Sequence, residues 1–361
     1  MRITVLALTL LVANFSTAQL NQVFAEPNVR IIDAHEHIQS INEASALREI
    51  NDNLGISKTI LVASPAETLG TVPAGNFSRY HENNEAILSI SKKFPDQFIP
   101  FCTLDTRQAF ALSYLKKCLS NGGKGLKLYN GHSQFYDVLK GPLDNPRLDP
   151  LYSFLNGTEL PVLYHINIAK YEEELNRLLK KFPKLRIEIP HFMVSSANLT
   201  RVSEFFNKYP NLYTDISFGA PEFMADGLLR ISHQHEEFTE FFTTYAERIL
   251  FGADIVITSN KTKNPEMIKD ILQCYISLLE KDYYACKPMV ELYSTKADAT
   301  HRKLTLCQKR GKMDCLPLRL EYERNLDLAE ESSHLQGLEL PPEILNQIFE
   351  TNADRFLKTK I

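Results

Sequence analysis

The sequence contains no tryptophan and has no excess of charge of either sign. Of its 361 residues, 40 are Lys or Arg and 44 are Asp or Glu, so the formal net charge is only −4. Without a basic surplus, neither a nucleic acid nor an anionic membrane is expected as the main partner. The 21 Phe and 15 Tyr residues supply the large side chains that a sizeable core needs. A small-molecule substrate is therefore the expected partner, and a homo-oligomer is compatible with the sequence.

Several familiar motifs are also missing. No two cysteines have the CxxC spacing, which argues against a structural zinc held by cysteines. No G-x-G-x-x-G follows a strand-like run, which argues against an open dinucleotide-binding sheet. The apolar run Ile3–Ala13 is too short for a transmembrane helix. The sequence is therefore expected to form a globular protein whose site is neither a cysteine-held zinc nor a dinucleotide-binding loop.

The first 25 residues have the composition of a secretory signal peptide. Arg2 provides a positive charge, Ile3–Ala13 has the length of an apolar h-region, and small residues follow at Ser16 and Ala18. Cleavage is expected near residue 18 or 25. A protein with such a signal is secreted or periplasmic, and the mature chain then spans about residues 26–361.

Export to an oxidising compartment would permit disulfides between the cysteines. Cys102 lies in a strand-like run, where a buried thiol is as compatible with the sequence as a disulfide. The pairing does not follow from sequence. Three of the six cysteines fall within a single polar stretch near the C-terminus; the full set is Cys102, Cys118, Cys274, Cys286, Cys307 and Cys315.

Short apolar or β-branched runs recur along the chain, and each is followed by a segment with helical periodicity. A cation followed by Phe or Tyr and then Pro predicts a helix end at Lys93, Lys181 and Lys208. Eight such repeats predict an α/β fold, a parallel (β/α)8 TIM barrel. The expected strands are Val29–Asp33, Lys58–Ala63, Phe98–Leu104, Gly125–Tyr129, Pro161–His165, Leu185–Pro190, Leu212–Ile216 and Ile249–Gly252.

The charge-rich stretch at about 283–338 interrupts this pattern. We interpret it as a partly ordered C-terminal insertion in the barrel domain, placed before a last helix over Pro342–Leu357. The sequence leaves open whether this insertion covers the site or packs on the barrel wall.

Ionisable residues stand at the predicted carboxyl ends of several strands, where barrel enzymes place their sites. His35 and His37 follow the first strand, and alternation in an extended chain puts their side chains on the same side, with Asp33 below them. His165, His191 and Asp254 stand at the predicted ends of the fifth, sixth and eighth strands. A donor set of three imidazole nitrogens and one carboxylate oxygen would suit a divalent ion, zinc above all, with iron or manganese as alternatives.

As an ordered set, these motifs resemble the amidohydrolase superfamily, in its amidohydrolase-related branch. The resemblance rests on Asp33-Ala34-His35-Glu36-His37, the two later histidines, Phe251-Gly252-Ala253-Asp254 and Asn352-Ala353-Asp354-Arg355-Phe356. It runs from about Ile31 to Phe356 without the insertion. That branch contains metal-dependent hydrolases and decarboxylases of the aminocarboxymuconate-semialdehyde and resorcylate type. The chain departs from it in two places: Phe192-Met193 stand where the family usually has glycine after the sixth-strand histidine, and Ile255-Val256-Ile257 stand where it often has a proline-containing turn after the eighth-strand aspartate.

The resemblance implies roles for individual residues. The metal ligands would be His35, His37, His165 and Asp254, with His191 as the catalytic histidine and Asp254 also able to take a proton from water. Asp33 is expected to orient a ligand histidine.

Lys127, at the end of the fourth strand, is the ambiguous position. It would act either as a hydrogen-bond donor beside one ion or, if carboxylated, as a bridge between two. His132, His233 and His235 are expected at the surface.

Three functions remain open. A hydrolase would use a metal-activated water to attack an ester, lactone or amide carbon. A non-oxidative decarboxylase would use the same residues, with His191 donating a proton to carbon. The third is a secreted binding protein that has lost turnover. The export signal favours hydrolysis.

Overall fold

The computed structural model describes residues 30–135, 137–195, 198–259, 263–309 and 314–358. The predicted signal peptide lies outside these residues. One eight-stranded sheet runs in the order β1 to β8, and neighbouring strands are parallel. All eight predicted strands are present, although the sixth and eighth are short. They are β1 Ile31–Glu36, β2 Ile56–Val62, β3 Phe98–Thr103, β4 Gly125–Asn130, β5 Val162–Ile166, β6 Ile187–Glu188, β7 Leu212–Asp215 and β8 Ile249–Leu250.

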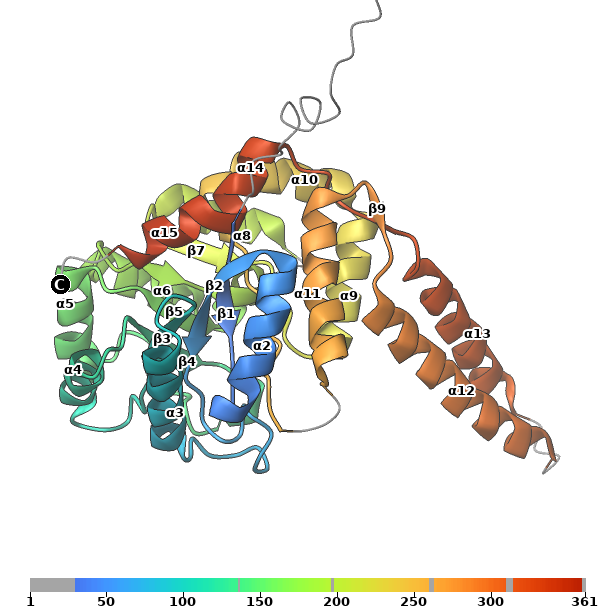
Figure 1. Cartoon of the computed structure of the whole chain (residues 1–361), viewed down its shortest axis with the longest axis horizontal. Helices are drawn as coiled ribbons and strands as arrows, with labels where there is room; N and C mark the ends of the chain where they lie inside the picture. Colours follow the sequence, from blue (N-terminus) through green and yellow to red (C-terminus); the bar gives the residue numbers. More distant parts are fainter. Residues whose placement is uncertain (1–29, 136, 196–197, 260–262, 310–313, 359–361) are drawn as a thin grey trace, which may run out of the picture.

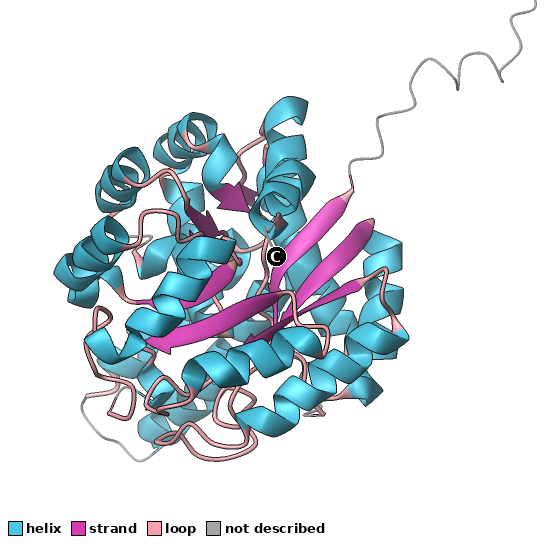
Figure 2. Cartoon of the chain, turned by 90° about the vertical axis from the view of Figure 1, so that its left-hand side faces the viewer, coloured by secondary structure: helices cyan, strands magenta, loops and turns pink. Residues whose placement is uncertain are grey.

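The sheet closes on itself between the first strand and the segment that follows the last. The backbone N–H of Ala34 donates to the Phe251 carbonyl at 2.7 Å, and that of Asp254 donates to the His35 carbonyl at 2.7 Å. A parallel bridge between Ile38 and Ile257 extends this contact. Figure 2 shows the strands enclosed by helices. The predicted (β/α)8 barrel is therefore confirmed.

Helices connect the strands on the outside of the barrel. The three Lys-aromatic-Pro segments end helices as predicted, because α3, α6 and α8 finish at Lys93, Lys181 and Lys208. The connecting α-helices are α2 Ile41–Leu54, α3 Tyr80–Lys93, α4 Ala111–Ser120, α5 Asp149–Thr158, α6 Ile168–Lys181, α8 Leu199–Lys208, α9 Pro221–His233, α10 His235–Thr244 and α11 Pro265–Glu280. The short segment α7 Pro190–Val194 is instead a left-handed turn. Single 3₁₀ turns occur at η1 Ser133–Phe135, η2 Pro146–Leu148 and η3 Ala246–Arg248.

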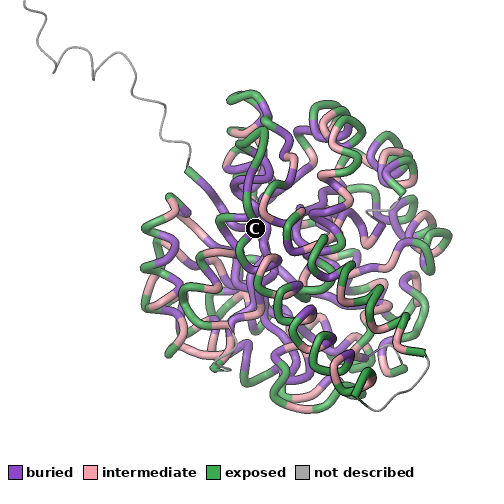
Figure 3. Tube along the Cα trace, turned by 90° about the vertical axis from the view of Figure 1, so that its right-hand side faces the viewer, coloured by how far each residue is buried: buried purple, intermediate pink, exposed green. Residues whose placement is uncertain are grey.

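Two apolar layers position the strands. The larger lies between the sheet and the helices, and the smaller fills the barrel interior with residues such as Ile32, Phe101 and Leu163. Figure 3 shows the buried trace concentrated in the centre of the molecule. Phe356 belongs to the interior layer and packs at 5.3 Å, between ring centroids, from Tyr213. A packed interior leaves the strand ends as the place for a site.

The last helical segment covers one end of the barrel (Figure 1). It occupies the predicted range, as α14 Pro342–Asn346, the π turn η4 Gln347–Thr351 and α15 Asn352–Leu357. Within the π turn, the Ile348 carbonyl accepts from the backbone of Phe251 at 3.1 Å. The Asn352 amide donates to the carbonyls of Ala246 and Ile249 at 2.6 and 2.8 Å. These bonds tie the C-terminal helix to the eighth strand.

The predicted insertion is a helical arm that extends from the barrel beside α9 and α11 (Figure 1). Its two helices are α12 Lys287–Lys309 and α13 Leu316–Glu331. At its base, β9 Tyr283–Tyr284 pairs antiparallel with β10 Leu335–Gln336. The arm extends away from the barrel, and none of its described residues lines the main cavity discussed below.

All six cysteines are paired. Cys307–Cys315 joins the two helices of the arm near its tip, and Cys274–Cys286 joins α11 to the base of the arm. Cys102 is bonded to Cys118, which decides between the two states left open by the sequence. Among the described residues, no helix combines the length and the apolar character needed to span a membrane.

Candidate metal centre

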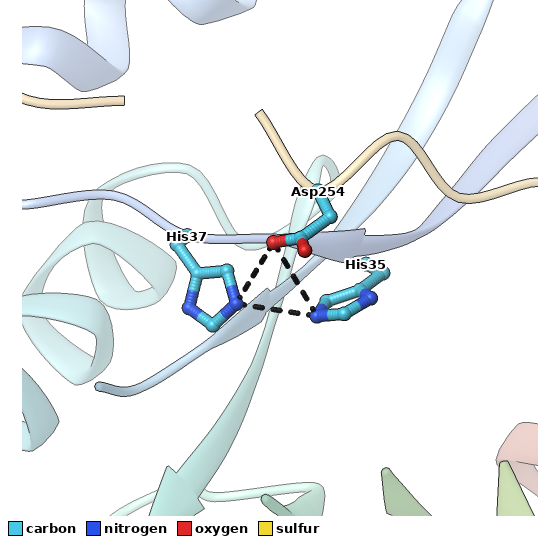
Figure 4. A group of neighbouring side chains, drawn as sticks. All are labelled: His35, His37 and Asp254. Atoms are coloured by element: carbon cyan, nitrogen blue, oxygen red, sulfur yellow. Dashed lines mark hydrogen bonds and ion pairs between the residues drawn. The ribbon is translucent and has the colours of Figure 1, made fainter. Parts of the chain in front are cut away.

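Three predicted ligands meet at the carboxyl end of the barrel (Figure 4). The Nε2 atoms of His35 and His37 are 3.2 Å apart. Asp254 Oδ1 lies 3.1 Å from His37 Nε2 and 3.7 Å from His35 Nε2. His35 and His37 come from the end of β1, whereas Asp254 follows β8, so the closure of the barrel brings them together. All three residues are buried.

The hydrogen bonds on the far side of each imidazole fix which nitrogen carries the proton. His35 Nδ1 lies 2.8 Å from Asp215 Oδ2, an acceptor, so Nδ1 donates and Nε2 keeps its lone pair. His37 Nδ1 contacts Ser64 Oγ, whose own proton is directed to the Val62 carbonyl. His37 Nε2 is therefore also a lone-pair donor.

This arrangement fits a divalent cation. Two nitrogen lone pairs and the buried Asp254 Oδ1, which has no hydrogen-bond donor, converge within 4.8 Å of one another. Such acceptors repel one another unless a positive charge lies among them. Imidazole nitrogens with a carboxylate oxygen form a donor set that suits zinc.

His165, the fourth predicted ligand, faces the same cavity from β5. Its ring centroid is 5.2 Å from that of His191, which in turn is 5.7 Å from that of His35. One cavity of about 710 Å³ is lined by His165, His191, Lys127 and Asp254, whereas His35 does not line it. Among the described residues, two groups have donor atoms within 4.8 Å of one another, His35 with His37 and Asp254, and His35 with Glu188 and Asp215; neither group includes His165.

Burial keeps the histidines in the form that ligates metal. It lowers the pKa of His37 to about 4 and lowers the pKa values of His35 and His165 as well. Burial alone would raise the pKa of Asp254, but His35, His37 and His191 together bring that pKa well below its usual value. Neutral imidazoles beside an ionised carboxylate are the protonation states that a metal site requires.

Lys127 projects from β4 toward the same centre. Its Nζ lies 3.0 Å from His35 Nε2 and 4.9 Å from the centroid of the Tyr129 ring. Burial lowers the pKa of Lys127 to about 8, while Asp254 and the buried Glu188 act in the opposite direction. In this structure, the Lys127 amine is positioned to donate a hydrogen bond to His35 Nε2.

His191 is held by its backbone. Residues His191–Val194 all have φ between +53° and +59°, a left-handed turn that costs about 1–2 kcal/mol for each residue with a Cβ. Two bonds stabilise the turn: His191 N donates to Asp215 Oδ1 at 2.8 Å and Met193 N donates to Thr214 Oγ1 at 3.1 Å. The family's usual glycine would adopt this conformation without strain, so the chain keeps the turn despite Phe192 and Met193.

The same contacts set the tautomer of His191. The Ser217 carbonyl, which can only accept, lies 3.1 Å from His191 Nδ1, and Ser217 Oγ lies 2.8 Å away with its proton directed to Asp215. Nδ1 therefore carries the hydrogen. The basic Nε2 is 3.5 Å from Asp254 Oδ2.

One prediction about a supporting residue is wrong. Asp33 does not bind an imidazole: its carboxylate accepts from the backbone N–H groups of His35 and Ala253, which join β1 to the end of the eighth strand. Asp215, at the end of β7, orients His35 instead. The sequence offered a signal for it, because Asp215 stands at a strand end just as the predicted ligands do.

The surface prediction for His132 is also wrong. This residue lines the cavity, with its ring stacked on Phe135 at 4.5 Å and its centroid 4.6 Å from His165. Burial, with Lys127 nearby, lowers its pKa to about 3. His233 is at the surface as expected and pairs with Glu331.

The fold is a closed parallel barrel, and imidazole and carboxylate groups that could hold a metal ion lie at its strand ends. The chain belongs to the amidohydrolase family, whose model matches residues 32–359. That match covers the barrel and the predicted ligand positions. No curated protein matches the chain.

Several solved structures are similar to the chain at low sequence identity. An uncharacterized TIM-barrel protein from Bordetella bronchiseptica is 17% identical, with a TM-score of 0.52, over 91% of this chain and 98% of that one. A 4-oxalomesaconate hydratase from Rhodopseudomonas palustris is 16% identical (TM-score 0.48; 91% and 95% covered). A 2,6-dihydroxybenzoate decarboxylase from Rhizobium is 18% identical (TM-score 0.42; 67% and 91% covered). The first of these supports the fold.

Proposed function

We propose that this protein is a metal-dependent hydrolase that cleaves an ester, lactone or amide of a small molecule. The observation that carries the proposal is the convergence of His35, His37 and Asp254 on one point, with the basic Nε2 of His191 facing Asp254 from the opposite side. His165 completes the proposed ligand set from β5. A bound divalent ion, zinc by preference, would lower the pKa of water to about 7 and polarise the substrate carbonyl.

The protein's own residues can move the proton that hydrolysis releases. Oδ1 of Asp254 faces the proposed ligand histidines and Oδ2 faces His191, so the same carboxylate contacts both the ligand cluster and the proposed catalytic histidine. A proton taken from the attacking water by Asp254 can pass to His191 Nε2 and from there to the leaving group. The Nδ1–H bond to the Ser217 carbonyl fixes the imidazole for this transfer.

Lys127 supports one ion in preference to two. Its Nζ lies 3.0 Å from His35 Nε2. Burial lowers the pKa of Lys127 to about 8, and Asp254, Glu188 and Asp215 oppose this shift, so the ammonium form still predominates at neutral pH over the neutral amine that carboxylation requires. As an ammonium group, Lys127 would donate a hydrogen bond to the substrate oxygen or to Asp254. The proposed stoichiometry is therefore one metal ion for each chain.

The cavity shape suits a mid-sized organic substrate. A volume of about 710 Å³ lies in the range usual for small-molecule sites. Its lining includes the apolar side chains of Leu69, Val194, Phe218 and Phe223, together with polar side chains from the loop after β4. The proposed substrate has an apolar face in addition to the scissile bond.

Two measurements test the proposal. Purified protein should contain about one equivalent of zinc, and a panel of lactones, aryl esters and anilides should show turnover that chelation abolishes. His191→Asn should keep the metal and lose turnover. Carbon dioxide release from hydroxybenzoates without hydrolysis of any panel member would identify a decarboxylase instead, and metal content without either reaction would favour a binding protein.

We also propose that the protein is exported. The signal-like residues 1–25 and the three cysteine pairs support this location. Sequencing the N-terminus of the protein recovered outside the cytoplasm should place the mature start after residue 18 or 25.

A further inference from the structure

One face of α9 forms a wall of the main cavity. Four of its residues line the cavity at spacings of three and four, which places them on one side of the helix. The helix begins at Pro221, two residues after Gly219, where a Cβ would lie 3.0 Å from Asp254 Oδ2. This wall therefore begins beside the proposed metal centre and extends away from it along the helix. The four residues are Phe223, Asp226, Gly227 and Arg230.

Arg230 contributes a guanidinium group that has no partner among the described residues. Its Nε is enclosed by protein atoms and donates to none of them, whereas its two terminal nitrogens keep accessible surface. No ion pair joins Arg230 to Asp226, one turn earlier, or to any other described carboxylate. A guanidinium has only donors and stays ionised, so this result does not depend on how its atoms are assigned. An ionised group left unpaired in a cavity wall is expected where a ligand supplies the acceptor.

The direction of this side chain follows from helix geometry. Side chains of a helix lean toward its N-terminus, so that of Arg230 leans toward the metal-centre end of α9. One turn earlier, Gly227 leaves room for Phe218, because a Cβ at position 227 would come within 2.4 Å of the Phe218 ring. The ring thus reaches from the loop beside the metal centre to the turn that precedes Arg230. An apolar surface therefore connects the metal centre with the guanidinium.

The charges that line the cavity favour an anionic ligand. Three cations and two carboxylates occur among its described lining residues, and a bound divalent ion would add to the positive side. Lys127 Nζ faces His35 Nε2, and Lys263 Nζ donates to the Ile255 carbonyl. Arg230 differs from both lysines in having no acceptor on the described part of the chain. A surplus of positive charge in a cavity attracts anionic ligands.

We propose that Arg230 binds a carboxylate of the substrate, at the end remote from the scissile bond. This inference rests on the proposed function, because the reacting carbonyl is placed at the metal centre. A carboxylate can accept two parallel N–H bonds from one guanidinium. Phe218 and the exposed Phe223 would contact the apolar part of the substrate between its two ends. The substrate class is therefore an ester, lactone or amide that also carries a carboxylate.

The test uses the zinc-loaded full chain and hydroxamates as probes that bind zinc. Hydroxamates with a terminal carboxylate are compared with their methyl esters, over chains of two to six methylene groups, by titration calorimetry, which needs no turnover. At one chain length or more, the acid should bind about tenfold to hundredfold more tightly than its ester, the effect of a hydrogen bond between ionised groups. In Arg230→Met, which keeps an unbranched side chain without the charge, this preference should disappear while the esters still bind.

Two further variants separate the guanidinium from its charge. Arg302→Met removes an exposed arginine of the arm, outside the cavity, and should keep the full preference. Arg230→Lys keeps the charge but cannot form two parallel bonds, so its preference should lie between those of the native protein and Arg230→Met. Equal binding of acid and ester at every chain length, or an unchanged preference in Arg230→Met, would overturn the inference.

A second readout does not need the metal. In the zinc-free protein, the ¹H–¹⁵N signal of Arg230 Nε, identified by its absence from Arg230→Met, should shift on addition of hexanoate and stay in place with methyl hexanoate. If no hydroxamate binds any variant, the metal centre has failed, and this signal decides the inference alone. A shift with hexanoate then supports the carboxylate subsite, and an unchanged signal overturns it.

Discussion

Substitution of Asp215 by Asn should weaken metal binding without unfolding the protein. The carboxylate of Asp215 accepts from four groups: Oδ2 from His35 Nδ1, and Oδ1 from His191 N and from the N–H and hydroxyl of Ser217, at 2.8–3.1 Å. Asparagine has one oxygen to offer. If that oxygen keeps the three donors on the Oδ1 side, its NH₂ group faces His35.

An NH₂ group can only donate, so His35 Nδ1 would have to accept. The ring proton of His35 would then move to Nε2, the atom that faces His37 and Asp254. A protonated nitrogen cannot ligate a metal. Losing the orienting partner of a ligand histidine usually weakens metal binding 10–100-fold, which corresponds to about 1.4–2.8 kcal/mol. The tautomer change places Asp215→Asn at the upper end of that range.

Zinc affinity can be measured by competition with a chromophoric chelator at pH 7.5, and folding can be checked by thermal melting of the metal-free proteins. Asp52→Asn is the matched control, because that aspartate is exposed and its ion pair with Arg48 spans 3.9 Å. It should leave zinc affinity unchanged. Equal zinc affinity in Asp215→Asn and the native protein would refute the reasoning from tautomers.

Three further predictions concern other parts of the molecule. His191→Asn should bind zinc as tightly as the native protein but lower kcat by about 10²–10⁴, the usual contribution of a general acid–base group; a loss of zinc equal to that of Asp215→Asn would make His191 a ligand. In the metal-free protein, His37 has a folded pKa of about 4 against 6.5 in the unfolded chain. The unfolded state therefore binds more protons between these values, and the unfolding free energy should fall by up to about 3 kcal/mol as the pH drops from 6.5 to 4, as followed by urea denaturation; a flat profile would contradict it. Replacing Cys307 and Cys315 by Ser should cost the arm about 2.5 kcal/mol in the chain-entropy estimate for a short loop and speed hydrogen exchange in α12 and α13, while exchange in the barrel strands stays unchanged.

Much of the fold was predictable because its signals are local. The strands were found from short β-branched runs, and the helix ends at Lys93, Lys181 and Lys208 from a cation followed by an aromatic residue and proline. Strand limits were less accurate where the ladder is short. Leu185–Pro190 was predicted for the sixth strand, but only Ile187–Glu188 pairs, because the chain turns left-handed from His191 onward.

The site was predictable to the extent that it follows from strand order. The carboxyl ends of parallel strands share one mouth of the barrel, so His35, His37 and Asp254 could be placed together although 219 residues separate Asp254 from His35. The partners of these ligands depend on side-chain direction, which alternation alone does not give. Asp33 was expected to orient an imidazole, but its carboxylate accepts from the main-chain N–H groups of His35 and Ala253. His132 was missed because its position depends on the turn at Gly131.

The base of the arm has a consequence for how the barrel can vary. The backbone N–H of Cys286 donates to the Ser332 carbonyl at 2.9 Å, so the chain leaves the barrel and returns to it at almost the same point. Such a junction tolerates exchange of whatever lies beyond it, since a tight turn or a foreign domain would meet the same two attachment points. Met289, Tyr293 and Ala329 join the main core at the base of the arm. We expect the part of the arm beyond them to tolerate changes of length and sequence without a change in the cavity.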